Sequence, residues 1–177
     1  AQEDHLISDD LGNRNTFSVS LGLLQNGQST DFLIVAHVAI DGFGVAVGIC
    51  GGEEGTEDFA LLELERELTY NKIPTAIIFH HPAKEPGGWL NRRLLENRDQ
   101  FNHIISKNSH VKLVLYGHIH YGIQHVENGV LYSAAPSIGY AFDKELPKFQ
   151  IADKQEGFNV IEIRNRVIDI IKINIHD

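Results

Sequence analysis

The sequence contains no methionine and only one cysteine. With Cys50 alone, no disulfide can form within the chain, and we expect a reduced, cytoplasmic setting. Long apolar runs are also missing, because the longest ones carry Asp, His or Gly, so no membrane-spanning segment is expected. The N-terminus, Ala1 to His5, lacks the cationic and apolar regions of a signal peptide.

Positive charge is scarce. The 15 Lys and Arg residues face 24 Asp and Glu residues, which gives a formal net charge of −9. Such a surface repels phosphate backbones, so neither a nucleic-acid polymer nor an anionic membrane is an expected partner. A small phosphorylated ligand could still be drawn to a bound metal ion. Oligomer formation is compatible with this composition, which does not decide it.

The chain alternates short apolar runs with helical stretches, which is the pattern of an α/β fold. Its 177 residues fit a single domain, 1–177. A helix is predicted from near Thr56, and a second one after a capping box formed by Asn97 and Gln100. The dipeptide Asn128-Gly129 predicts a hairpin turn. Predicted strands lie at 32–35, 75–79, 111–116, 129–132, 158–163 and 171–175, and the apolar stripe of the first helix consists of Phe59, Leu61, Leu62, Leu64 and Leu68.

Two histidine clusters follow two of the predicted strands. His80, His81 and Pro82 come directly after 75–79, and Gly117-His118-Ile119-His120 comes directly after 111–116. Ligand sites in open α/β sheets lie at the carboxyl ends of the strands, so imidazoles on two neighbouring strand ends predict a metal site. If the second cluster is extended, His118 and His120 point the same way and Ile119 points into the core.

From about Gly51 to Arg164, the chain resembles the C-terminal half of a calcineurin-like metallophosphoesterase, most closely the class of cyclic-nucleotide and glycerophosphodiester phosphodiesterases. The resemblance rests on the order of motifs along the chain. After an acidic amphipathic helix and a strand come His80-His81-Pro82, Gly88-Trp89-Leu90-Asn91, Leu95-Glu96-Asn97, the run from Val111 to His120, Ala135-Pro136-Ser137, Tyr140-Ala141-Phe142 and Gly157-Phe158.

The resemblance implies an α/β sandwich of two β-sheets flanked by helices and a hydrolase with a dinuclear metal centre. It implies two divalent ions, Fe, Mn or Zn, and a small phosphodiester substrate of the cyclic-nucleotide or glycerophosphodiester type. His80 and His118 would bind one metal and His120 the other, while His81 would lie beside them rather than ligate. Trp89 and Asn91 lie in a loop that could form a substrate wall. No catalytic residue other than these ligands is identified.

The first 43 residues match the family only as a degenerate or incomplete N-terminal half, whereas 44–177 correspond to its C-terminal half. Asp4 and His5 stand where the family has a metal-binding Asp-x-His pair, but one residue is missing between them. His37 stands where a bridging Asp is expected, and the Gly-Asn-His-Asp motif has no counterpart. Because methionine is also absent, we hypothesise that segments are missing from this sequence and that one residue originally separated Asp4 from His5.

Two other interpretations stay open. In the first, a catalytically impaired relative keeps the fold as a binding module, which His37 and the absent motif favour. In the second, His80, His118, His120 and one Asp form the site of a mononuclear metal hydrolase. A metal-to-protein ratio near one or near two separates the mononuclear site from the dinuclear one.

Overall fold

The computed structural model describes residues 44–47, 56–92, 94–143, 145, 147–153, 155–164 and 167–176. The predicted strand at 32–35 and the candidate residues Asp4, His5 and His37 therefore lie outside the described residues. In chain order the elements are β1 (Gly44–Val47), α1 (Thr56–Tyr70), β2 (Thr75–Phe79), the 3₁₀ helix η1 (Gly88–Arg92), α2 (Arg98–Lys107), β3 (Val111–Tyr116), β4 (Ile123–Glu127), β5 (Val130–Ala134), β6 (Ala141–Phe142), β7 (Ile151–Ala152), β8 (Gly157–Arg164) and β9 (Val167–Asn174).

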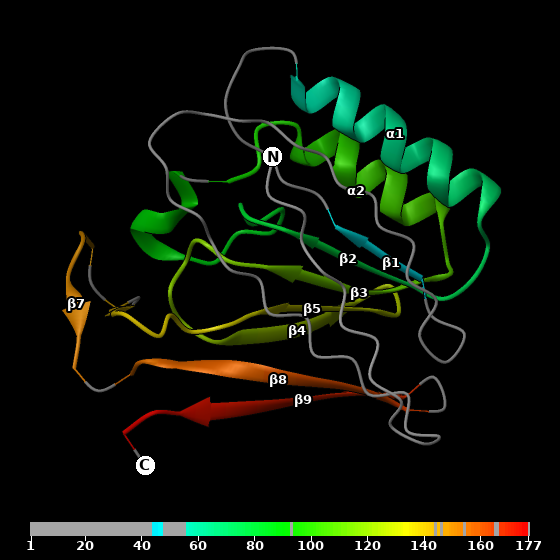
Figure 1. Ribbon diagram of the computed structural model, residues 1–177. Helices are drawn as coiled ribbons and strands as arrows, with labels where there is room; N and C mark the ends of the chain where they lie inside the picture. Colours follow the sequence, from blue (N-terminus) through cyan, green and yellow to red (C-terminus); the bar gives the residue numbers. More distant parts are fainter. Residues whose placement is uncertain are drawn as a thin grey trace, which may run out of the picture.

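A five-stranded sheet forms the centre of the described chain, with the strand order β1-β2-β3-β5-β4 (Figure 1). The strands β1, β2, β3 and β5 run parallel, and β4 is the antiparallel edge strand. The side chains of Thr75, Val111 and Val114 are almost fully buried, as expected for strands that are covered on both faces. The predicted α/β class is thus confirmed.

The helices α1 and α2 cover one face of this sheet (Figure 1). Leu61, Leu64 and Leu68 of α1 are buried in the same core as Phe101 and Ile104 of α2. Leu62 was predicted in the apolar stripe of α1, but 64% of it is exposed. Each helical residue turns about 100° from the previous one, so Leu62 points away from the face that its neighbour Leu61 buries.

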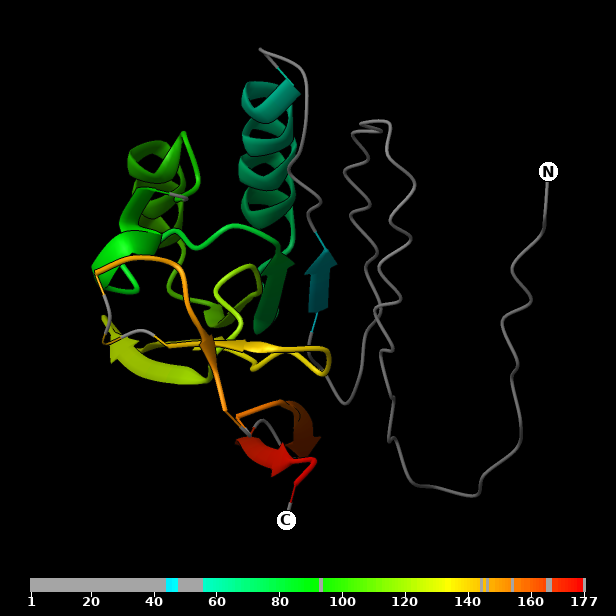
Figure 2. The ribbon, with the colours of Figure 1, turned by 90° about the vertical axis from the view of Figure 1, so that its left-hand side faces the viewer.

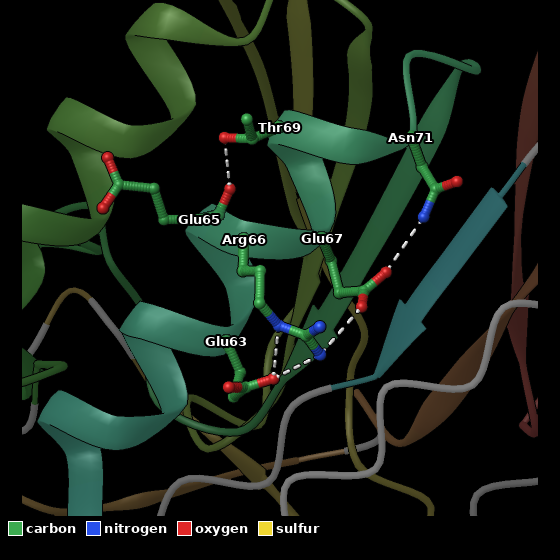
Figure 3. A network of polar contacts seen from close by, with 6 residues as sticks. All are labelled: Glu63, Glu65, Arg66, Glu67, Thr69 and Asn71. Carbon is green, nitrogen blue, oxygen red and sulfur yellow. Dashed lines mark hydrogen bonds and ion pairs between the residues drawn. The ribbon is translucent and has the colours of Figure 1, made fainter.

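Charged side chains on α1 and an amide just beyond it form a polar network (Figure 3). Arg66 pairs with Glu63 at 2.7 Å and with Glu67 at 3.2 Å, and the amide of Asn71 donates to Glu67 over 2.9 Å. Such surface pairs contribute only about 0–1 kcal/mol each. The position of α1 is therefore determined by its buried leucines rather than by its charges.

The helix α2 begins after Asn97 as predicted, but Asn97 makes no side-chain capping hydrogen bond, so the predicted capping box is wrong. The backbone of Asn97 has φ −89° and ψ 34°, which is not the extended conformation that a capping side chain requires. At the other end, Asn108 donates its side-chain amide to the carbonyl of Ile104 at 2.8 Å. Its oxygen accepts from Lys72 at 3.2 Å, which ties α2 to the segment after α1.

The predicted turn at Asn128-Gly129 connects β4 with β5, and both residues have positive φ values, 51° and 77°. This agrees with the predicted hairpin. A second hairpin, β8–β9, lies on the opposite side of the central sheet from the helices in both views (Figures 1 and 2). The amide of Asn159 in β8 reaches the carbonyl of Ala134 in β5 over 3.3 Å. The apolar side chains Phe158 and Val160 are partly exposed, 42% and 38%, so the outer face of β8 carries apolar groups.

None of the helices in the described ranges is long and apolar enough to cross a membrane.

Candidate metal centre

The two histidine clusters meet because β2 and β3 are neighbouring parallel strands. Phe79 pairs with Tyr116 at the last position of the register, so each cluster begins at the same carboxyl edge of the sheet. The backbone N–H of Gly117 donates to the carbonyl of His80 over 3.0 Å, which extends the pairing by one residue. A Cβ on residue 117 would lie 3.5 Å from Nδ1 of His80. This is an ordinary van der Waals separation, so the packing against His80 would also accommodate a small side chain at 117.

Three imidazoles gather at this edge. One ring nitrogen from each of His80, His81 and His118 lies within 4.8 Å of the others. Nε2 of His80 and Nδ1 of His118 are 3.1 Å apart, and the rings of His81 and His118 are 4.5 Å apart. All three residues are half-buried. The structure thus brings His80 and His118 together, as the sequence predicts, and places His81 in the same group.

The second cluster is not extended as predicted. His118 and His120 have φ values of 65° and 56°, in the left-handed region that non-glycine residues visit rarely. Ile119 is completely buried, and its N–H donates to the carbonyl of Gly117 over 2.7 Å. The inward direction of Ile119 is confirmed, but the two histidines are directed by a tight turn. A strained backbone conformation persists only where the surrounding structure compensates for its energetic cost. Such conformations are concentrated at functional sites.

His120 contacts a different set of groups. Its ring is stacked on Phe142 of β6, with centroids 4.4 Å apart and planes inclined by only 7°. Its Nδ1 lies 3.1 Å from the carbonyl oxygen of Tyr140. Since a carbonyl can only accept, Nδ1 carries the proton, and the lone pair of the neutral ring is on Nε2. This arrangement, in which a carbonyl fixes the tautomer of a histidine, is typical of metal ligands.

Burial favours the neutral form of His80 and of His120. It lowers the pKa of His80 below its ordinary value, and the nearby His81 and His120 lower it further by charge repulsion. Burial also lowers the pKa of His120, an effect that the hydrogen bond to the carbonyl of Tyr140 partly opposes. Metal ions compete with protons for the imidazole lone pair. The lowered pKa values of His80 and His120 therefore favour the form that can coordinate a metal ion.

The predicted substrate loop lies next to the site, although its side chains have structural contacts. Trp89 packs its ring against Phe142 at 5.2 Å and Phe149 at 5.9 Å. The side-chain oxygen of Asn91 accepts from the backbone N–H of Gly87 over 2.8 Å within the loop. The hydroxyl of Tyr121, just beyond the second cluster, donates to the carbonyl of Pro86 over 2.6 Å. The bond from Tyr121 to Pro86 links the loop to the turn that carries His118 and His120.

Sequence reasoning missed the aromatic residues that surround His120. Tyr140 and Phe142 were part of the motif order, but no role was assigned to them, and Phe149 was not considered. The sequence signal that could have identified this group is the spacing of Tyr140, Phe142 and Phe149 after the second histidine cluster, together with the single tryptophan, Trp89. Only the fold shows that these side chains come together.

The comparisons with known proteins agree with the motifs. The chain is 35% identical over 112 residues to a probable cyclic nucleotide phosphodiesterase of Moraxella catarrhalis, which covers 61% of this chain and 40% of that protein. It is 33% identical over 103 residues to a 3',5'-cyclic-nucleotide phosphodiesterase of Nostoc sp., covering 58% and 38%. It is 29% identical over 118 residues to the cyclic AMP phosphodiesterase CpdA of Escherichia coli, covering 66% and 42%. The chain thus spans about two fifths of the length of these curated relatives.

Among solved structures, the fold is similar to that of GAP50, the anchor in the inner membrane complex of Plasmodium. The TM-score is 0.56 at 14% sequence identity, over 75% of this chain and 45% of that one, and this likeness concerns the fold alone. No protein-family profile matches the chain. The histidine motifs on neighbouring strand ends and the sequence matches to several cyclic nucleotide phosphodiesterases support the resemblance of this chain to the calcineurin-like metallophosphoesterases.

Proposed function

We propose that this protein is a metal-dependent phosphodiesterase that hydrolyses a small phosphodiester of the cyclic-nucleotide or glycerophosphodiester type. The observation that carries the proposal is the group of three imidazoles at the carboxyl ends of β2 and β3. The relatives named as cyclic nucleotide phosphodiesterases support the reaction type, and they favour cyclic nucleotides over glycerophosphodiesters as substrates. A cytoplasmic location is part of the proposal, and it rests on the single cysteine.

The donor set fits a metal ion. A tetrahedral ion with nitrogen ligands at about 2.0–2.1 Å separates those nitrogens by roughly 3.4 Å. The 3.1 Å between Nε2 of His80 and Nδ1 of His118 is close to this separation. Their rings are tilted by 83° rather than stacked. Imidazole suits zinc, iron and, with added carboxylates, manganese.

We assign His80 and His118 to one metal ion and His120 to a second, with His81 beside the first. A bound divalent ion lowers the pKa of a water molecule and neutralises charge that develops on the phosphoryl oxygens during displacement. The chain's own contribution is to hold its ligands in place. Ile119 anchors the turn between His118 and His120, and Phe142 fixes the ring plane of His120. Asp4 and His5 stay predicted ligands, and His37 a predicted neighbour of the site.

The proposal is tested with an aryl phosphodiester, bis(4-nitrophenyl) phosphate, before and after metal removal. We expect hydrolysis to be lost with a chelator and restored by Mn²⁺. His118→Ala should lower the restored rate at least a hundredfold, because it removes a ligand at the centre of the imidazole group. His103→Ala is the matched control, since His103 is exposed on α2 and should leave the rate unchanged.

The same preparation separates the alternative functions. Two metal ions per chain support the dinuclear centre, whereas one ion with retained hydrolysis supports the mononuclear site. If the folded, metal-loaded protein shows no turnover that depends on Mn²⁺, the chain is a binding module and the proposed activity is wrong.

A further inference from the structure

An aromatic cluster adjoins the histidine site. Its centre is Phe142 in β6, which is only 8% exposed. Four rings contact Phe142: His120 at 4.4 Å, Trp89 and Phe149 at 5.2 Å each, and Tyr140 at 5.6 Å. Buried aromatic clusters usually have a packing role, so the members that remain exposed are the informative ones.

Two rings of this cluster are accessible. Tyr140 is 42% exposed and Phe149 is 57% exposed, although both rest on the buried Phe142. Tyr140 also contacts the ring of His120 directly, with centroids 4.8 Å apart. We call Tyr140 and Phe149 the aromatic platform. The ring of Tyr140 contacts His120, a predicted metal ligand. The ring of Phe149 contacts Phe142, which in turn contacts His120.

The platform is held in place by the elements around it. The strands β6 and β7 pair through Ala141 with Ala152 and Phe142 with Ile151, and the backbone N–H of Asp143 donates to the carbonyl of Gln150 over 2.9 Å. This short ladder brings the segments before and after it together. The edge of Trp89, from η1, meets the rings of Phe142 and Phe149 with interplanar angles of 65° and 78°. Preorganised rings lose little conformational entropy when a ligand stacks on them.

We propose that the aromatic platform stacks on the planar base of a nucleotide whose phosphate is held at the histidine site. This inference rests on the proposed function and narrows its substrate class to nucleotides. An aliphatic glycerol group would gain little from aromatic faces, whereas every nucleobase has a π-face that stacks on an aromatic side chain. Because stacking uses the π-face that every base has, the platform recognises a base without distinguishing sharply among bases.

The single tryptophan reports on the platform. Trp89 is the only tryptophan in the sequence, and its ring contacts Phe149. A base that stacks on Phe149 should change the indole fluorescence. The experiment titrates the Mn²⁺-loaded protein with adenosine 5'-monophosphate and with ribose 5-phosphate, which carries the same phosphate but no base. We expect the nucleotide to bind about 5- to 150-fold more tightly, the range given by the stacking of one base.

Substitutions in the aromatic platform test whether its two rings cause the tighter binding of the nucleotide. In the double variant Tyr140→Leu, Phe149→Leu, the affinity for the nucleotide should fall to that for ribose 5-phosphate, while the affinity for ribose 5-phosphate stays as in the unmodified protein. Leucine keeps much of the apolar volume against Phe142, so the fold should persist. The matched control is Tyr70→Leu on α1, where the ring is 77% exposed and far along the chain from the site. It should keep the full preference for the nucleotide.

The outcomes separate this inference from the proposed function. Equal affinities for the two ligands, or a preference that survives the double substitution, would overturn the platform even if aryl phosphodiesters are hydrolysed. A nucleotide preference that is lost in the double variant would support the platform even in a protein that hydrolyses no phosphodiester. If neither ligand binds, the platform is likewise overturned.

Discussion

At the scale of the residue, the histidines show what the sequence could and could not predict. The positions of His80 and His118 at strand ends followed from apolar runs that stop at the histidines, and the fold brings both to one edge. The turn through His118 and His120 could not be predicted by alternation, because both residues adopt left-handed backbone. Backbone propensities of amino acids do not predict a left-handed conformation for histidine. It depends on the anchoring of Ile119 in the core, which is a tertiary effect.

His80 and His81 offer a test of which imidazoles bind metal. His80 lies 3.1 Å from His118 between ring nitrogens, and its carbonyl is fixed by Gly117. We expect His80→Ala to lower the affinity for Zn²⁺ at least a hundredfold, as measured by calorimetric titration. His81→Ala should cost about tenfold, the lower end of the range for a neighbour that only supports a ligand. Should His81→Ala weaken binding as much as His80→Ala does, His81 is itself a ligand and our assignment is incorrect.

At the scale of the element, strands were easier to predict than helix faces. Runs such as Thr75–Phe79 and Val111–Tyr116 became β2 and β3 within their predicted bounds, because a strand that is buried on both faces is apolar throughout. Not every leucine of α1 lies on its buried face. The composition of the helix alone therefore could not show that Leu68 is buried and Leu62 is exposed. The hairpin β4–β5 was predictable, because Asn128-Gly129 suits a turn in which both residues have positive φ.

Leu62 and Leu68 of α1 form a matched pair for a test of the orientation of the helix. Leu68 is 2% exposed in the core, whereas Leu62 is 64% exposed. We expect Leu68→Ala to lower the free energy of unfolding by about 2–5 kcal/mol, since it leaves a cavity between α1 and the sheet. Leu62→Ala should change it by less than about 0.5 kcal/mol. Urea denaturation followed by circular dichroism measures both, and similar losses in the two variants would contradict the described orientation of α1.

At the scale of the whole molecule, partly buried histidines make the stability of the metal-free protein depend on pH. Burial lowers the pKa of His110, with help from Lys72 and Lys112. Burial also lowers the pKa of His125, where Lys84 acts in the same direction and Glu127 opposes it. His125 is stacked on Tyr132 at 4.9 Å in the hairpin β4–β5.

The sign of the effect follows from proton binding. As the pH falls below about 6.5, the unfolded chain binds protons at these histidines before the folded protein does, so acid destabilises the fold. We expect a lower urea midpoint at pH 5.5 than at pH 7.5 with a chelator present. His125→Gln should reduce this difference, and His103→Gln, on the exposed face of α2, should leave it unchanged. A midpoint that is equal or higher at pH 5.5 would contradict the expected direction.

The arrangement of layers also places the site. The helices cover one face of the central sheet, and the hairpin β8–β9 lies on the other side (Figures 1 and 2). The histidines follow the carboxyl ends of β2 and β3. The α/β class and the location of the site at that edge were predictable from periodicity and from the ends of the apolar runs. The aromatic residues that pack on Phe142 of β6 come from η1, the residue before β6 and the loop before β7, and only this packing reveals them as one group.

The central claim is that imidazoles at the ends of β2 and β3 support the hydrolysis of a phosphodiester. The most direct measurement is the rate at which the metal-free protein, given Mn²⁺, converts cyclic AMP to 5'-AMP, compared with the His80→Ala, His118→Ala double variant under the same conditions. Our account predicts a rate that requires Mn²⁺ and falls at least a hundredfold in the folded double variant. Equal rates in the two proteins, or no Mn²⁺-dependent conversion by the unmodified one, would contradict it.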